Sequence, residues 1–581
     1  MFGFFTVPTA TASTVAPTIL NATGDALTLA DNNLVSNFLI EGAGGHGIVA
    51  NGIDGSRVSH VTVDGATMDG IAISNITGSL DFVDASVMNS GQNGISIDGD
   101  DGVITFFGDT TIQDSTNAGL SIMNLTTTTV TNPDSTTTDV PGTAQFQNLA
   151  ITETTGADAM SLVDNDGDIF FNDLEIETSG GGRGVVARNS DRVTSNQGTI
   201  STVGAAAIDS EDSNLNMLLT SLSTDGGTNA IRMVRTDGRI LVFGSGALGS
   251  GGTIQNTTTA IVMEDSGTLG LQSIDFTGNQ VVADIDNSES LEFSLSRITG
   301  TTQQVINALN LKNLDLGDSL LENNTTTTGS HIQYAVDQDG SYVVSILSSD
   351  LMDTTDTLLE VQQLNNAISP VLALTFMQNQ VELIGNGAKA ADVNWIGSVQ
   401  STISGNQVLG SDDNQVAFDI NNSHATATTN LLFQSNTVGL SGDSSIGLDV
   451  MSTSTSVIEV SQNLMGIGGD NGTSVRISGD DEGDFGFFEN TFTATAGGAT
   501  AVRFLTIDTG SSLIFSSNSV DYSNVNTFID TGIDIDAVTG TSPIVNLSST
   551  ANNVMLGVDA IFSAPSGTTS GAILINNNLV P

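Results

Sequence analysis

Apolar positions return along this chain in a short motif: a small residue, an apolar residue, a variable residue and a second apolar residue. The residues at 70–73, 94–97 and 119–122 are Gly-Ile-Ala-Ile, Gly-Ile-Ser-Ile and Gly-Leu-Ser-Ile, and Gly-Ile-Val at 47–49 precedes them. The small residues are 23, 24 and 25 positions apart. A repeat of this length indicates stacked units, none of which buries its apolar face without its neighbours.

The same motif continues through the chain with a slowly drifting period. It returns at 184–186, 207–209, 230–233, 260–263, 417–420, 447–450, 474–477 and 501–504. Its strict alternation of apolar and variable positions is typical of strands.

A second motif, Phe-X-X-Asn, keeps a fixed distance to the first. Its members are Phe276 with Asn279, Phe376 with Asn379, Phe433 with Asn436, Phe487 with Asn490, and Phe515 with Asn518. Each Phe lies 13 to 16 residues after the small residue where both motifs are legible, which predicts a second strand in each repeat. Alternating runs after many of the Asn residues predict a third. We expect each Phe to point inward and each Asn to stand at a bend, where its amide bonds the Asn above and below.

These patterns predict an all-β fold, a right-handed parallel β-helix (β-solenoid) with about three strands per coil. A coil of about 24 residues implies roughly two dozen coils. We expect residues 1–25 to form an N-terminal extended segment or cap and residues 26–581 a single β-helix rod, because no linker divides the chain. A Thr/Pro-rich stretch near 126–142 exceeds the coil length, so it is predicted to leave the stack as a loop, which on repeat proteins often carries binding.

The charge balance narrows the choice of partners. The chain has 12 Lys and Arg against 65 Asp and Glu, a net charge of −53. Nucleic acid and anionic membrane surfaces are therefore poor partners, and no nucleic acid is expected to bind, because this chain repels phosphate. There is no Cys, so disulfides and thiolate zinc sites are excluded too. No stretch approaches the roughly 18 apolar residues of a membrane span, so no membrane insertion is expected of this segment.

Acidic turns are candidates for weak Ca²⁺ binding. The run 164–168 places carboxylates at alternate positions around a Gly, as loops for hard cations do, and the turns at 98–102 and 480–484 are similar. The candidate ligands are Asp164, Asp166, Asp168, Asp98, Asp100, Asp480, Asp481 and Asp484. None of the three turns has the downstream Glu of a complete Ca²⁺ loop, and the alternative is that they are solvated bends with ordinary Asp turn chemistry.

Half of the cationic residues gather in one stretch. They are Arg183, Arg188, Arg192, Arg232, Arg235 and Arg239. Counted from the small residue of each repeat, Arg188, Glu211 and Arg235 would stack as cation, anion and cation on three consecutive coils. Two interpretations follow: a surface ionic ladder, or a candidate interaction patch that docks an acidic partner such as another copy of this chain.

The two motifs together resemble the repeats of chlamydial polymorphic outer-membrane proteins and, more broadly, right-handed β-helix autotransporter passengers and adhesins. The resemblance covers most of residues 40–575. The Gly-Gly-Ala-apolar tetrad of that family has its nearest counterpart in Gly-Gly-Ala-Thr at 497–500, and the Cys residues of those proteins are missing. The resemblance implies surface display and adhesion, with no catalytic residue to carry over.

Enzymatic chemistry finds little support in the sequence. Gly-His-Gly at 45–47 is similar to the motif of β-helical polygalacturonases, but Asp100 and Asp101 follow it instead of preceding it, and no Arg-X-Lys exists. The only two lysines, Lys312 and Lys389, leave few bases for a Ca²⁺-dependent lyase. We therefore expect a chain that is not an enzyme, with Ca²⁺ as its one candidate cofactor.

The predicted function is a non-catalytic extracellular protein of the bacterial cell surface, an adhesin or structural rod that presents a long acidic face. Its partners would be host or neighbouring cell-surface molecules, glycans or other copies of itself. Two alternatives stay open: a subunit of an extracellular filament or sheath that grows by end-to-end stacking of β-helices into a homopolymer, and a polysaccharide-active β-helix enzyme.

Overall fold

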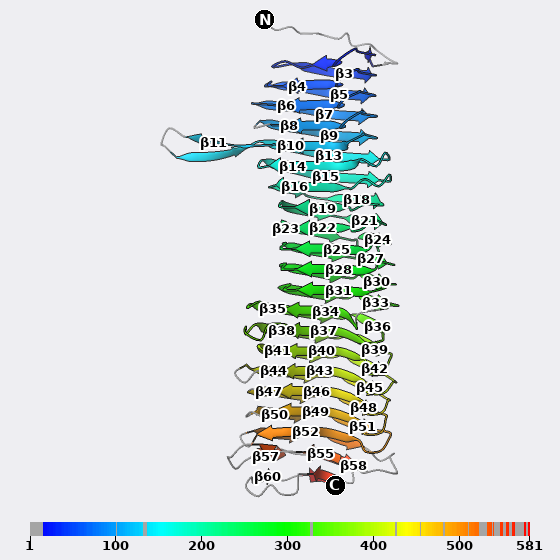
Figure 1. Ribbon diagram of the computed structural model, residues 1–581, viewed down its shortest axis with the longest axis vertical. Coiled ribbons are helices and arrows are strands. Elements are labelled where there is room, and N and C mark those ends of the chain that lie inside the picture. Colours follow the sequence, from blue (N-terminus) through cyan, green and yellow to red (C-terminus); the bar gives the residue numbers. More distant parts are fainter. Residues whose placement is uncertain are drawn as a thin grey trace. The chain divides into compact units, whose positions relative to one another are not determined.

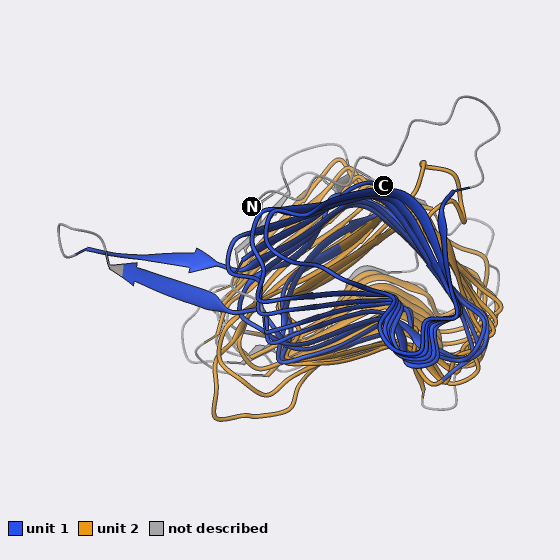
Figure 2. Cartoon of the chain, turned by 90° about the horizontal axis from the view of Figure 1, so that it is seen from above, with its two compact units in different colours: residues 1–227, 231–240 blue, residues 228–230, 241–581 orange. Residues whose placement is uncertain are grey.

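Strands dominate the part of the chain that the structure describes. The computed structural model describes residues 16–99, 102–131, 136–325, 329–423, 427–453, 455–479, 483–508, 511–521 and 531–536, and beyond these only short strands up to residue 580. Strand accounts for 64% and no helix occurs in the described residues (Figure 1). Two compact units make up the chain: unit 1 comprises residues 1–227 and 231–240, and unit 2 comprises residues 228–230 and 241–581 (Figure 2).

The small-apolar-X-apolar motifs form the first strand of each coil. In unit 1 these strands are β2 (Leu27–Thr28), β4 (Ile48–Asn51), β6 (Ile71–Ser74), β8 (Ile95–Asp98), β10 (Ala118–Met123), β14 (Asp158–Asn165), β16 (Val185–Ser190), β19 (Ile208–Glu211) and β22 (Ile231–Val234). Neighbours in this series pair in parallel, so Ile71 lies between Ile48 and Ile95. The predicted parallel β-solenoid is confirmed.

The small residue of the motif is fixed by a close contact across the coil. A Cβ atom on Gly70 would lie 2.2 Å from Cγ1 of Val87, and one on Gly94 would lie 2.3 Å from Cγ2 of Ile112. Val87 and Ile112 are fully buried on the strand that follows each motif. A larger residue at this position would have to push the branched side chain out of the core, which explains why the period is legible in the sequence.

In the earlier coils of unit 1, one long strand follows the first strand. In the later coils, two shorter strands take its place. The long strands are β3 (Leu34–Glu41), β5 (Ser56–Asp64), β7 (Ser79–Met88), β9 (Val103–Gln113), β13 (Thr143–Glu153) and β15 (Asp168–Thr178), and the divided ones are β17 (Val193–Ser195) with β18 (Gly198–Val203) and β20 (Asn214–Leu219) with β21 (Ser221–Asp225). The expected three strands per coil therefore apply from β16 onward.

Unit 2 keeps three strands per coil. Its first strands are β25 (Thr259–Glu264), β28 (Val281–Asp286), β31 (Gln304–Leu309), β34 (Ser330–Val336), β37 (Thr357–Gln363), β40 (Lys389–Trp395), β43 (Val416–Asn422), β46 (Ile446–Ser452), β49 (Thr473–Gly479), β52 (Thr500–Asp508) and β55 (Thr531–Ile535). The second strands are β26 (Thr268–Gln272), β29 (Ser290–Ser294), β32 (Asn313–Gly317), β35 (Ser341–Leu347), β38 (Val371–Met377), β41 (Ser398–Ser404), β44 (Thr429–Gln434), β47 (Ser456–Ser461), β50 (Gly483–Phe488) and β53 (Ser512–Ser516). The third are β24 (Gly252–Gln255), β27 (Ile274–Thr277), β30 (Arg297–Thr299), β33 (Leu320–Glu322), β36 (Asp350–Thr354), β39 (Gln380–Leu383), β42 (Gln407–Gly410), β45 (Thr437–Leu440), β48 (Leu464–Ile467), β51 (Thr491–Ala494) and β54 (Ser519–Asp521).

The number of coils is smaller than the sequence suggested. The first strands named above mark 20 coils between residues 27 and 535, compared with the roughly two dozen expected for the chain. One physical reason is that many coils of unit 2 are longer than 24 residues: Val416 pairs with Ile446, and Ile446 with Thr473. The extra residues lie at the bends, where insertion leaves the strand register unchanged.

A column of Asn side chains runs along the bend between the second and third strands of unit 2. It consists of Asn379, Asn406, Asn436, Asn463, Asn490 and Asn518. The Nδ2 of each of the first five donates to the Oδ1 of the Asn on the next coil at 2.9 to 3.1 Å. Each Oδ1 after the first also accepts the backbone N–H of the Asn before it, as Asn436 Oδ1 does from Asn406 at 3.1 Å.

One predicted member of this column lies elsewhere. Phe276 is on β27, a third strand, and Asn279 lies at the next bend, where its Oδ1 accepts the N–H of Thr257 at 3.0 Å. The residues in register with Phe376 and Asn379 are found one coil later, at Phe293 and Ser296. Sequence spacing misassigned the pair because both bends of the coil use the same side-chain-to-backbone hydrogen bond.

Unit 1 has an aromatic column that the sequence motifs did not predict. The rings of Phe82, Phe106, Phe146 and Phe171 are stacked, with centroids 4.8, 4.6 and 5.5 Å apart. All four rings are fully buried. Because no Asn follows these residues at a fixed distance, the Phe-X-X-Asn search passed over them.

The Thr/Pro-rich stretch forms a hairpin that projects from unit 1 (Figure 2). β11 (Thr127–Thr131) pairs with β12 (Thr137–Pro141) in antiparallel fashion, whereas the other described pairs of strands are parallel. The hairpin leaves the coil at a narrow neck, where Gly142 N–H donates to Thr126 O at 2.7 Å. The insertion thus adds an exposed element without changing the stack, since β10 still pairs directly with β14.

Replacing Asn436 with Ala tests the amide column. The change leaves the N–H of Asn406 and the carbonyl of Ile403 buried without their partners, and we expect the free energy of unfolding to fall by roughly 3 kcal/mol. Asn436→Ser should cost less, because a Ser hydroxyl accepts the same N–H in earlier coils, as Ser349 does from Ser319. Urea unfolding measures both. Asn430→Ala, at an exposed position, is the control. An equal loss of unfolding free energy in this control would contradict a stabilising role of the amide column.

A buried carboxyl group makes the stability of unit 1 depend on pH. Glu153 ends β13 and is fully buried in a column where neighbouring coils have Thr178 and Thr202. Burial raises its pKa from 4.5 to about 7, although Oε2 accepts the N–H of Ser115 at 2.7 Å. The folded state therefore binds this proton more tightly than the unfolded chain, so the contribution of Glu153 to stability is fully present below pH 4.5 and is lost as pH rises through 7.

Glu153→Gln should remove this dependence. At pH 8 the variant should be more stable than the parent by roughly 3 kcal/mol, since the neutral amide avoids burying a charge. At pH 4.5 the two should be nearly equal. Unfolding curves at both pH values measure the difference, with the exposed Glu175→Gln as control. A variant that is less stable than the parent at pH 8 would disprove burial of the Glu153 charge as the cause.

Candidate functional site

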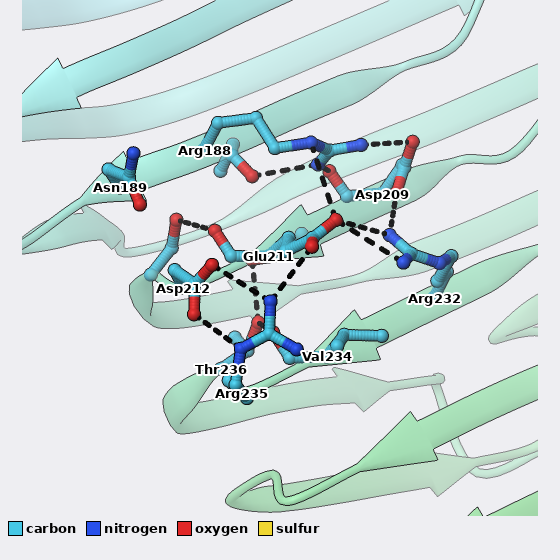
Figure 3. Close-up of polar contacts among 12 residues, drawn as sticks. Arg188, Asn189, Asp209, Glu211, Asp212, Arg232, Val234, Arg235 and Thr236 are labelled. Atoms are coloured by element: carbon cyan, nitrogen blue, oxygen red, sulfur yellow. Dashed lines mark hydrogen bonds and ion pairs between the residues drawn. The ribbon is translucent and has the colours of Figure 1, made fainter.

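The clustered arginines meet four carboxylates on consecutive first strands of unit 1. Arg188 on β16 pairs in register with Glu211 on β19, and Asp209 on β19 pairs in register with Arg232 on β22. Because equivalent residues on parallel strands lie about 4.8 Å apart, charges of opposite sign at matching positions come directly into contact. Figure 3 shows the resulting network.

Asp209 is the centre of the network. Its Oδ2 accepts from Arg183 Nη1 and Arg188 Nη2, both at 2.7 Å, and its Oδ1 accepts from Arg232 Nη1 at 3.0 Å. The residue is 8% exposed. Burial alone would raise the pKa of Asp209, but the three guanidinium groups outweigh burial and lower it. The carboxylate is therefore ionised and held at its position by three donors.

Glu211 and Asp212 extend the network toward solvent. Arg235 donates from Nη2 to Glu211 Oε1 at 2.8 Å and from Nε to Asp212 Oδ1 at 2.6 Å. Arg188 Nε lies 3.9 Å from Glu211 Oε2, so the stacking order of Arg188, Glu211 and Arg235 is the one that the sequence suggested. Hydrogen bonds from Arg235 lower the pKa values of both carboxyl groups.

The network has no net charge. Its four cations are Arg183, Arg188, Arg232 and Arg235, and its four anions are Asp158, Asp209, Glu211 and Asp212. The guanidinium groups are thus already occupied, and an acidic partner would have to displace bonds of 2.6 to 3.0 Å to reach them. The geometry therefore shows a surface ionic ladder, the first of the two interpretations of the clustered arginines. Docking of an acidic partner stays a prediction.

The other two arginines of the stretch lie outside the network. Arg192 is 3.5 Å from the carboxylate of Asp168. Arg239 is exposed and, within the described residues, has no carboxylate within ion-pair distance.

The candidate Ca²⁺ ligands are dispersed among separate bends. Asp164 and Asp98 accept from the amides of Asn189 and Asn124 at 2.9 and 2.7 Å, so each is paired with an Asn on the next coil. Asp166 is exposed at its turn and Asp484 lies on β50. Asp100, Asp480 and Asp481 lie outside the described residues. In the described part of the chain no three His, Cys, Asp or Glu residues form a group that could hold a metal ion, and Ca²⁺ binding stays a prediction.

His46, in the Gly-His-Gly motif, lies in a turn of unit 1. Its Nδ1 accepts the N–H of Asp69 at 3.2 Å and lies 3.4 Å from the carboxylate of that residue. Asp69 in turn accepts from the amide of Asn93 at 3.0 Å. These contacts join three consecutive coils, so the visible role of the histidine is to hold its turn.

The fold defines the chain as a repeat protein of the parallel β-solenoid class. No protein-family model matches its sequence, and no curated protein matches it. Within the described ranges, no helix is long and apolar enough to cross a membrane.

Asp209→Asn should destabilise unit 1, because three guanidinium groups would lose their shared counter-ion and face one another. We expect the free energy of unfolding to fall by about 1–3 kcal/mol at low salt and by less at high salt, where repulsion among the arginines is screened. The matched control is Asp237→Asn, which removes the same charge from an exposed residue. Equal effects of the two substitutions in thermal unfolding would show that the network contributes nothing specific.

Proposed function

We propose that this chain is a non-catalytic protein of the cell exterior, an adhesin or structural element akin to autotransporter passengers. The observation that carries the proposal is the use made of the cationic side chains. Every Lys and Arg except Arg57 and Arg239 contacts a carboxylate on a neighbouring coil, and all twelve lie in the described part of the chain. Cations that serve to join coils are a feature of a structural protein.

Unit 2 uses its cations in the same way. Lys389 Nζ lies 2.8 Å from Asp392 and 2.6 Å from Asp419 on the next first strand. Arg476 pairs with Asp449, again one coil away. The desolvation of Lys389 would lower its pKa, but the two carboxylates outweigh it and raise the pKa. These groups are thus held in charged, structural contacts and are not poised for proton transfer.

The remaining acidic residues keep the surface strongly negative. A surface of this kind remains soluble at high concentration and repels nucleic acid and anionic lipid. It also tolerates salts and divalent cations, which screen the repulsion between coils. These properties favour a place outside the cell and partners that are neutral or cationic.

The hairpin β11–β12 supports a role in contact with other surfaces. Val130 and Val140 are 44% and 46% exposed and lie on the same side of the two strands, because Val130 pairs with Thr138 and Val140 with Thr128. A two-stranded hairpin that projects into solvent with an apolar face is suited to meeting a partner.

Adhesion of coated beads tests the proposal. Beads that carry the purified chain should attach to bacterial or host cell layers several times more often than beads with serum albumin or with the heat-unfolded chain. The same preparation should release no reducing sugar from a panel of acidic and neutral polysaccharides. Attachment no better than albumin, or steady release of sugar, would contradict the proposed function.

A further inference from the structure

Part of one face of unit 1 consists of eight uncharged outward residues although the chain carries a net charge of −53. Its residues lie at exposed or half-buried positions of β9, β13, β15, β17 and β20 or of the bends directly after them. We call this face the neutral strip and define it by Phe107, Gln145, Gln147, Phe170, Asn172, Thr194, Asn196 and Asn216. We propose that the neutral strip binds an extended, uncharged polysaccharide chain, an inference that rests on the proposed role in adhesion and names its ligand class.

The strip is built by strand register. Gln145 lies beside Phe170, which lies beside Thr194 and then Asn216 on successive strands. The second row runs parallel to it, and in it the amide of Asn196 donates to Asn172 at 3.4 Å. Five strands about 4.8 Å apart give the strip a length of about 19 Å, which suits several sugar rings in a row.

The absence of charge determines which polymer the strip could accept. Asp109 and Asp173 flank it at the adjoining bend. An anionic polysaccharide would meet these carboxylates and the field of the whole chain, and the eight residues of the strip include no cation. Two cations border the strip: Arg192, which lies 3.5 Å from the carboxylate of Asp168, and Arg239 on β23 (Asp237–Phe243), which pairs with β20. A neutral polysaccharide meets neither penalty, so the charge distribution selects against acidic glycans without a repulsive contact inside the strip.

The polar groups of the strip match sugar hydroxyls. A carboxamide donates and accepts at once, as a hydroxyl group does. Gln147 uses its Oε1 to accept from Gly108 N–H at 2.9 Å, and its Nε2 remains available. Gln145 is exposed and, among the described residues, none bonds its amide. These side chains can therefore bind a ligand without giving up a hydrogen bond of the fold.

The aromatic residues supply the apolar part of the contact. Phe107 is 42% exposed, unlike its neighbour Phe106, which is fully buried in the aromatic column. Phe170 is half-buried on β15, two strands away. Exposed rings on a strand face offer their π surfaces to the C–H face of a sugar. An exposed sheet face is suited to a polymer held at many weak points.

Paired substitutions test the inference without disturbing the fold. Gln145→Glu with Asn172→Asp preserves side-chain shape and adds two negative charges to the strip. Gln400→Glu with Asn430→Asp adds the same charges to exposed positions on neighbouring strands of unit 2, where Gln400 and Asn430 pair in register. The full chain and both variants are tested for depletion from solution by cellulose, chitin and mixed-linkage β-glucan, with polygalacturonate gel as the acidic probe.

We expect the parent chain to be retained by at least one neutral polysaccharide and not by polygalacturonate. The strip variant should bind about tenfold more weakly or worse, and the unit 2 variant should bind like the parent. No retention by any neutral probe, or equal loss in both variants, would overturn the inference. If beads still adhere to cells in that case, the proposed function stands without this ligand. If neither binds, both fail.

Discussion

Every coil of this protein rests on the coil before it, so each side chain meets its equivalent about 4.8 Å away. This constraint favours side chains that interact well with their own kind. Apolar residues do so by burial, Phe rings by stacking, and Asn by donating from Nδ2 and accepting at Oδ1 at once. The Asn column of unit 2 and the ring column of Phe82, Phe106, Phe146 and Phe171 are both consequences of it.

Like charges are the side chains that this stacking tolerates least, and the chain has 65 acidic residues to place. Two arrangements keep the acidic side chains of neighbouring coils apart. Asn alternates with Asp at several bends, as Asn189 does with Asp164. Elsewhere a cation lies between acids on neighbouring coils, and Asp209 with its three arginines is the most developed case. Ten of the twelve cations thus join neighbouring coils.

Much of this could be predicted from residue patterns, and the failures have physical causes. The stacking of Arg188, Glu211 and Arg235 follows from period alone because all three lie near the regular first strand. The central position of Asp209 does not, since it depends on Arg183 reaching across from a bend. His331 is a clearer failure: it lies in the column of small residues, between Val305 and Leu358, and is 1% exposed with a pKa that burial lowers to about 4. No local motif signals that a histidine is buried there, because the space for it is made by neighbouring coils.

The sequence by itself determined the fold class, the parallel strands and the Asn at the bends, because these depend on short-range patterns that every coil repeats. The tertiary structure decided which bend each Asn serves, as with Asn279, how Glu153 came to be buried, and which outward side chains form one uncharged face. These depend on which residues of different coils become neighbours, and because coil length varies, spacing along the sequence does not reveal those neighbours.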